Sequence, residues 1–258
     1  MLHKELILIL DFGSQYTQLI TRRIREAKVY SEIHQHSFPL EKIKLLKPSG
    51  IILSGGPMSV YDKDSPKIDS EIFNLGIPIL GICYGLQLIS HNFGGIVEPA
   101  EDREYGKAKI AIQSDTKILS GVKDDSVVWM SHGDLIAKMP NGFVINATTE
   151  NTPICVVSNE EKEIYGLQFH PEVAHTEQGK IIIDNFLFNI CGCSGNWTSA
   201  NFIKSSISEI KSQVGESRVI CALSGGVDSS VAAILMSEAI GDNLICIHID
   251  SGMMRKNE

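Results

Sequence analysis

Three short apolar runs, each ending in a glycine-containing turn, constrain the fold of this chain most strongly. Residues 6–10 (LILIL) run into DFGS, residues 50–53 (GIIL) into SGGP, and residues 77–82 (IPILGI) into CYG. Such runs are typical of strands buried on both faces of a parallel sheet. Apolar residues at helical spacing follow at 19–27 and 86–92. We therefore expect an α/β fold, with a flavodoxin-like parallel or mixed sheet covered by helices on both faces. Its site should lie beyond the carboxyl ends of the strands.

The stretch from about residue 105 to residue 196 has a different pattern. Short β-rich runs alternate with Asp, Gly, Asn and Pro; they are residues 108–112, 126–130, 144–147, 154–157 and 164–169. Residues 181–190 have the apolar pattern of a closing helix, and CGCSGN at 191–196 has the composition of a linker. We expect a first domain at residues 1–196.

A second unit begins near Trp197. Its pattern predicts a helix at 199–214, a strand at 218–223, a glycine-rich turn, a helix to about residue 240 and a strand at 244–250. Two strands and two helices cannot cover both faces of a parallel sheet. We therefore expect residues 197–258 to be an incomplete domain that is loosely ordered or leans on a partner, while the first domain folds independently.

Cys83 is the candidate nucleophile. It lies in Gly81-Ile-Cys83-Tyr-Gly85, which has the form of a nucleophile elbow with cysteine in place of serine. The flanking glycines permit a sharp turn from strand to helix. That turn holds the sulfur at a helix N-terminus, where the dipole favours the reactive thiolate. A buried core cysteine is the competing interpretation.

The run YGLQFHPE at residues 165–172 supplies candidate partners for a nucleophile. A β-like run ends in His170, and Glu172 follows after a proline that stiffens the turn. An imidazole oriented by a carboxylate can take the thiol proton and later protonate a leaving amine. A hydrogen-bonded turn histidine and a solvated surface glutamate are the competing interpretations.

Together GICYGLQ (81–87), HPE (170–172) and the earlier SGGP (54–57) resemble the class I, or triad, glutamine amidotransferases. The resemblance implies that Cys83 attacks the glutamine carboxamide to give a γ-glutamyl thioester and ammonia, with His170 and Glu172 completing the triad. It also implies an oxyanion hole formed by the backbone N–H groups of Gly56 and Tyr84. Further parts of the glutamine pocket implied by the resemblance are Gly55, Gln87, Ser131, His132, Gly133 and Asp134. For residues 131–134, a polar turn after a strand is the competing interpretation.

A glycine-rich loop in the second unit has the features of a phosphate cradle. Backbone N–H groups, serine hydroxyls and a helix dipole converge after the apolar run 219–223. No lysine follows the glycines, so it is not a Walker loop. It resembles the loop of ATP pyrophosphatases, which implies ATP binding by Ser224, Gly225, Gly226, Val227, Asp228, Ser229 and Ser230. Asp228 would be a partner for Mg²⁺. An ordinary strand–helix turn is the competing interpretation.

The two sets of motifs in one chain, with HIDSGMMRKNE (248–258) close behind, resemble the family of glutamine-dependent GMP synthases. That resemblance implies glutamine, XMP and Mg-ATP as substrates, and no tightly bound prosthetic group. It also implies a homodimer formed through a C-terminal domain not present in this chain. The DSGMM run departs from the DxGLL that we expect of the family, which leaves the adenine contacts open.

Composition limits the partners and the compartment. The formal net charge of −8 gives no basic field for nucleic acid, and no apolar run approaches the roughly 18 residues of a membrane span. Six dispersed cysteines in a chain of this size suggest reduced thiols in the cytoplasm. Three alternatives stay open: a chain with glutaminase activity alone, a non-catalytic binding or regulatory fragment, and a cysteine hydrolase of the α/β-hydrolase type, in which the acid would precede the histidine.

Overall fold

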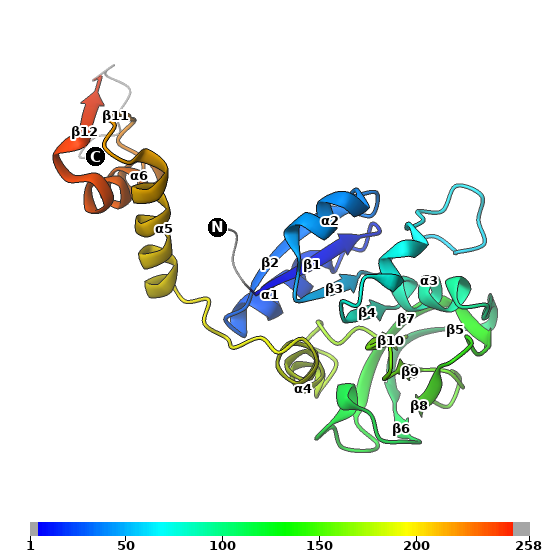
Figure 1. The fold of residues 1–258 in the computed structure, drawn as a ribbon. Coiled ribbons are helices and arrows are strands. Elements are labelled where there is room, and N and C mark those ends of the chain that lie inside the picture. The colour runs from blue at the N-terminus through cyan, green and yellow to red at the C-terminus, as the bar shows by residue number, and fades with distance from the viewer. Residues whose placement is uncertain (1–4, 250–258) are drawn as a thin grey trace. The chain divides into compact units, whose positions relative to one another are not determined.

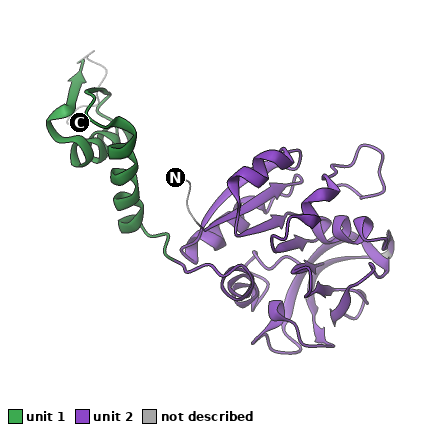
Figure 2. Ribbon diagram, viewed as in Figure 1, with its two compact units in different colours: residues 1, 196–258 green, residues 2–195 purple. Residues whose placement is uncertain are grey.

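The computed structural model describes residues 5–249, which divide into two compact units (Figure 2). The first unit extends to Gly195 and the second begins at Asn196. Within residues 5–249, every helix is too short or too polar to span a bilayer.

The first unit is built on an eight-stranded mixed sheet (Figure 1). In spatial order its strands are β2 (Tyr30–Gln35), β1 (Leu6–Asp11), β3 (Gly50–Leu53), β4 (Ile79–Ile82), β10 (Ile164–Leu167), β9 (Val156–Asn159), β8 (Val144–Thr148) and β6 (Ala111–Ile112). The strands from β2 to β10 pair in parallel, and the remaining three pairings are antiparallel. The order β2-β1-β3-β4 followed by a fifth parallel strand is the flavodoxin-like order. The expected fold class is confirmed.

Helices cover both faces of this sheet. The side chains of β1 alternate between the two faces, and each set packs in its own apolar cluster. Ile7 and Ile9 pack in one cluster with α1 (Thr17–Glu26), α4 (Gly179–Asp184) and η3 (Asn185–Ile190). Leu8 and Leu10 pack in the other cluster with α2 (Leu40–Leu46) and α3 (Tyr84–Asn92). The closing helix expected at 181–190 is therefore present, although its second half is π-helical: the Cys191 N–H donates to Phe186 O, five residues back. Two short 3₁₀ turns complete the unit, η1 (Ser70–Asn74) and η2 (Lys117–Leu119).

A separate antiparallel pair, β5 (Ile96–Lys109) and β7 (Val127–Lys138), lies beside the main sheet. The register between them shifts between Pro99 and Glu104. The β-rich runs at 108–112 and 126–130 predicted only the end of β5 and the beginning of β7. Residues 131–134 lie in the middle of β7, where Ser131 pairs with Tyr105, so the interpretation of this segment as a turn is wrong. Cross-strand pairing overrides the polar local sequence here.

The second unit contains the elements that its sequence pattern predicts. They are α5 (Ser199–Val214), β11 (Val219–Leu223), α6 (Val227–Ile240) and β12 (Leu244–His248); a short 3₁₀ turn that was not predicted, η4 (Gly241–Asn243), precedes β12. β11 and β12 pair in parallel, and the Thr198 side chain caps α5 by accepting a hydrogen bond from the Asn201 N–H. The expected end of the last strand at Asp250, and the run that follows it, lie outside the described residues.

Candidate active site

Cys83 occupies a strained turn between β4 and α3. Its φ of 52° and ψ of −104° lie outside the regions that non-glycine residues ordinarily adopt. The turn closes because α3 approaches β3 at Gly85, where a Cβ atom would stand 2.3 Å from Leu53 O. The sulfur is thereby held at the N-terminal end of α3, where the helix dipole favours a thiolate.

His170 and Glu172 follow the end of β10 and form a buried pair. His170 Nδ1 lies 2.8 Å from Glu172 Oε1, and the two residues are 3% and 0% exposed. The backbone of His170 is fixed on both sides, since its N–H donates to Trp129 O and its carbonyl accepts from Thr176 Oγ1. The interpretation of Glu172 as a solvated surface acid is therefore wrong.

The environment of His170 favours its protonated form. Burial lowers the pKa of His170, but its hydrogen bonds with Cys83 and Glu172 outweigh burial and raise the pKa to about 10. The Tyr16 ring contacts the imidazole edge-on, with 5.0 Å between ring centroids. An imidazolium held in this place stabilises a neighbouring thiolate by its charge.

Two backbone N–H groups beside the nucleophile are free to bind an anion. Neither Gly56 N nor Tyr84 N donates to a protein acceptor among residues 5–249. Gly56 fits tightly, because a Cβ there would lie 2.8 Å from Phe12 O. The preceding peptide is held by the Ser54 hydroxyl, which donates to Gly55 O at 2.9 Å.

An open cavity of about 760 Å³ lies over Cys83 and His170. Of the pocket residues expected from sequence, those that line it are Gly56, Gln87, Ser131, His132, Gly133 and Asp134. The Asp134 carboxylate accepts hydrogen bonds from Ser59 at 2.5 Å and from Tyr61 at 2.9 Å. The Arg103 guanidinium reaches the same cavity from β5. Gly55 lies behind the triad instead, where a Cβ would stand 3.2 Å from His170 Cε1.

The glycine-rich loop of the second unit joins β11 to α6. Gly225 has φ +85°, and Gly226 caps α6 with Val227 as the first helical residue. The Ser229 and Ser230 hydroxyls donate to Gly226 O at 3.0 and 2.9 Å, and Ser224 Oγ lies 3.1 Å from Ser229 Oγ. Asp228 is exposed in the first turn of α6, and its carboxylate accepts no hydrogen bond from the described residues.

Comparison with known proteins identifies the family. The model of the family "Glutamine amidotransferase class-I" matches residues 8–190. The chain belongs to this family. A second model, described as "tRNA methyl transferase HUP domain", matches residues 217–258. The match to the amidotransferase family decides against the α/β-hydrolase alternative.

Individual relatives extend the similarity beyond the amidotransferase domain. Over 252 residues, 98% of the chain, it is 56% identical to a glutamine-hydrolysing GMP synthase from Carboxydothermus hydrogenoformans and 55% identical to one from Bacillus cytotoxicus. The chain spans about half the length of these curated relatives (50% and 49%). Among solved structures, a protein from Thermoplasma acidophilum, provisionally described as one of the subunits of a GMP synthase, is 31% identical with a TM-score of 0.64. That match covers 79% of this chain and 98% of the other.

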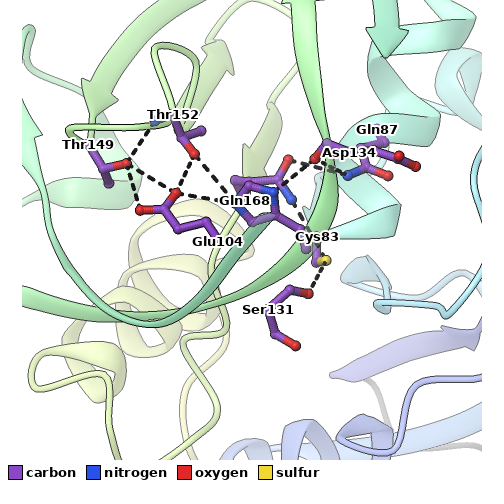
Figure 3. A network of polar contacts seen from close by, with 9 residues as sticks. Cys83, Gln87, Glu104, Ser131, Asp134, Thr149, Thr152 and Gln168 are labelled. Atoms are coloured by element: carbon purple, nitrogen blue, oxygen red, sulfur yellow. Dashed lines mark hydrogen bonds and ion pairs between the residues drawn. The ribbon is translucent and has the colours of Figure 1, made fainter. Parts of the chain in front are cut away.

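A chain of polar contacts behind this amidotransferase site was not predicted (Figure 3). Gln168 donates to Cys83 Sγ at 3.7 Å and lies 3.5 Å from Gln87, whose amide donates to Asp134 O at 3.2 Å. His132 Nδ1 lies 2.9 Å from the same carbonyl oxygen, and its Nε2 lies 3.5 Å from Glu104. Burial lowers the pKa of His132 despite the nearby carboxylate.

The far end of this chain of contacts is anchored by two threonines. Thr152 donates to Glu104 at 2.6 Å, and Thr149 lies 3.5 Å from the same carboxylate. Gln168 could have been suspected from sequence, because it is a polar residue in an otherwise apolar run. Glu104 gave no signal, because it lies in the charged stretch EDRE, which has the composition of a solvated surface.

Proposed function

We propose that the first unit hydrolyses glutamine, with Cys83 as nucleophile and His170 and Glu172 as its partners. The observation that carries this proposal is the cysteine in a strained elbow beside a buried His170–Glu172 pair 2.8 Å apart. The two unpartnered N–H groups of Gly56 and Tyr84 support an oxyanion hole at the same place.

The reaction would proceed in two halves. The Cys83 thiolate attacks the carboxamide carbon, and the N–H groups of Gly56 and Tyr84 stabilise the tetrahedral oxyanion. His170 gives its proton to the departing ammonia, which leaves a γ-glutamyl thioester. His170 then takes a proton from water, which attacks the thioester and releases glutamate. Glu172 keeps the imidazole oriented and stabilises its positive charge.

The cavity has the charges that an amino acid requires. The Asp134 carboxylate can accept from the α-ammonium group of glutamine, and the Arg103 guanidinium can pair with its α-carboxylate. Gln87, Ser131, His132 and Gly133 complete the wall, with Gly55 behind the triad. Because the cavity is lined by both an acidic and a basic group, it favours a zwitterionic ligand such as glutamine over an uncharged amide.

The ammonia would serve a GMP synthase in the whole protein. ATP adenylates the C2 oxygen of XMP, ammonia displaces AMP, and the products are GMP, AMP and pyrophosphate. We assign residues 1–196 to the glutamine amidotransferase domain and 197–258 to the N-terminal part of the ATP pyrophosphatase domain. The family matches at 8–190 and 217–258 support this division. The full protein would be a cytoplasmic homodimer, and the six free thiols fit a reducing compartment.

The loop at 224–230 suits the phosphates of ATP. The N-terminus of α6 would bind a phosphate, together with the serine hydroxyls of the loop once those of Ser229 and Ser230 turn from Gly226 O to the anion. The exposed Asp228 carboxylate is open to the Mg²⁺ that accompanies ATP. The groups needed to bind XMP would come from outside this chain.

Glutaminase assays test the first part of the proposal. Cys83→Ala should abolish glutamate release, while Glu172→Ala should reduce it less, because orientation of His170 is weakened and the nucleophile remains. Cys246→Ala, at an exposed cysteine of the second unit, is the control and should leave the rate unchanged. Persisting glutaminase activity in Cys83→Ala would refute the assignment.

The synthase part requires the full-length protein. There Cys83→Ala should still convert XMP to GMP when ammonium salts and Mg-ATP are supplied, because the two reactions use different domains. A folded full-length variant that makes no GMP from ammonia would contradict the two-site interpretation.

A further inference from the structure

Gln168 is a fully buried amide whose side chain reaches the nucleophile. It is 0% exposed, and its Nε2 lies 3.7 Å from Cys83 Sγ, within the range for a donor to sulfur. The backbone of Gln168 is fixed by the N–H donating to Cys155 O at 2.8 Å. Gln168 stands two residues before His170 in the chain. Its amide is therefore a second polar side chain at the Cys83 sulfur, in addition to the His170 imidazole.

The direction of the Gln168 amide is set by its neighbours. An amide has one accepting and one donating end, and the hydrogen-bond network decides which end faces which atom. The starting point is Asp134 O, a backbone carbonyl that can only accept. Gln87 must therefore present its NH₂ group to Asp134 O, at 3.2 Å. The same NH₂ group faces Gln168 at 3.5 Å, so Gln168 turns its oxygen to Gln87 and its NH₂ group to Cys83.

The carbonyl that sets this direction is itself held in place. His132 Nδ1–H donates to Asp134 O at 2.9 Å, in either charge state of the imidazole. The other ring nitrogen of His132, Nε2, faces Glu104 and Thr152. Glu104 belongs to β5, and Thr152 lies between β8 and β9 of the same unit. The chain of contacts thus runs from the partly buried carboxylate of Glu104 to the sulfur (Figure 3).

We propose that Gln168 is a further catalytic residue, whose amide donates a hydrogen bond that stabilises the Cys83 thiolate. The proposal rests on the proposed function of Cys83 and adds a residue to it. A hydrogen bond to a charged acceptor is stronger than one to a neutral acceptor, so the contact favours thiolate over thiol. The hydrogen bond from Gln168 acts against the effect of the Ser131 carbonyl. That carbonyl accepts a hydrogen bond from the Cys83 thiol at 3.6 Å and therefore favours the neutral thiol.

The test is the pH dependence of Cys83 alkylation in the 258-residue chain. Iodoacetamide reacts with the thiolate and releases iodide, and peptide mass spectrometry follows Cys83 separately from the other cysteines. Gln168→Met keeps the length of the side chain without a donor, and Gln168→Glu keeps its shape and, when ionised, offers acceptors only. Asn185→Leu is the control: it removes another buried amide, which donates to Ile118 O and Ser120 O away from the nucleophile.

In Gln168→Met the pH at which half of Cys83 is thiolate should rise by about one unit, a tenfold change in the thiolate-to-thiol ratio. Gln168→Glu should shift it further, and Asn185→Leu should leave it unchanged. The other ionisable groups around the sulfur are the same in every variant; among the side chains that the structure describes, they are Tyr16, Arg103, Glu104, His132, Asp134, His170 and Glu172. Thermal unfolding shows which variants are folded. An unchanged midpoint in a folded Gln168→Met or Gln168→Glu would overturn the proposal.

Glutamine hydrolysis gives a second readout. The kcat of Gln168→Met should be reduced several-fold at neutral pH and recover toward wild type above the new midpoint. A residue that served only the fold would lower kcat at every pH. Because alkylation requires no glutamine, it tests Gln168 even if the chain releases no glutamate, so the two proposals can fail separately.

Discussion

At the scale of single residues, the proton on His170 ties the site to the stability of the fold. Burial lowers the pKa of His170, yet Cys83 and Glu172 raise it to about 10, above the ordinary value of 6.5. The folded state therefore holds this proton between pH 6.5 and about 10, where the unfolded chain has lost it. The stabilisation is complete below pH 6.5 and is lost as the pH rises toward 10, with a slope of up to about 1.4 kcal/mol per pH unit.

Urea unfolding at pH 7, 8 and 9 measures that slope. Cys83→Ala and Glu172→Gln should each flatten it, because each removes one of the groups that raise the His170 pKa. Cys246→Ala, an exposed cysteine, should keep the wild-type slope. Equal slopes in all four proteins would mean that the pKa of His170 is not raised in the folded state.

The residues of the proposed triad were predictable and their support was not. Cys83, His170 and Glu172 stand in short runs whose chemistry is visible in the sequence. Their proximity depends only on parallel strands β4 and β10 ending at one edge of the sheet. Glu104 reaches His132 because β5 pairs with β7 across a register shift, and Thr152, from the segment between β8 and β9, donates to Glu104. No local sequence pattern encodes the pairing of β5 with β7. The contacts of Glu104 and Thr152 could therefore not be predicted from the sequence.

At the scale of elements, the approach of α3 to β3 determines whether the elbow can form. A Cβ on Gly85 would lie 2.3 Å from Leu53 O, and backbone on both sides leaves neither atom free to move. We expect Gly85→Ala to lower the free energy of unfolding of the first unit by about 1–3 kcal/mol, the usual effect of overpacking. Urea unfolding followed by circular dichroism measures it. Gly133→Ala is the matched control, because its Cβ would meet only ordinary contacts at 3.8–3.9 Å. An equal effect of the two substitutions would show that α3 shifts without cost.

Strands buried on both faces were predicted well, and strands with polar faces were missed. β1, β3 and β4 are continuous apolar runs because both faces are covered. β2 carries YSEIHQ at the edge of the sheet, and its polar side chains hide the strand pattern. The first half of β5 contains Pro99 and a charged stretch, both of which argue against a strand when the sequence is considered alone.

At the scale of the whole molecule, apolar burial is unequal between the two units. Both core clusters consist of residues of the first unit. In the second unit the apolar side chains of α6 are not gathered on one face, and Val227 is 78% and Ile234 is 62% exposed. On β12, Ile245 and Ile247 are nearly half exposed. Exposed aliphatic surface of this extent is typical of an interaction surface or an aggregation site. The first unit should therefore hold nearly all of the cooperative stability of the chain.

Removal of residues 196–258 tests this expectation. The remaining piece should unfold within about 2 °C of the full chain and hydrolyse glutamine at the same rate, because neither core cluster loses a residue. Fluorescence of the apolar dye ANS should fall on truncation, since the dye binds exposed aliphatic surface.

In the 258-residue chain, limited proteolysis should cut first within α5 to β12, and calorimetry should detect no tight Mg-ATP binding, because the loop at 224–230 lacks a packed support. A protease-resistant second unit, or micromolar affinity for Mg-ATP, would show instead that these residues form a complete binding domain.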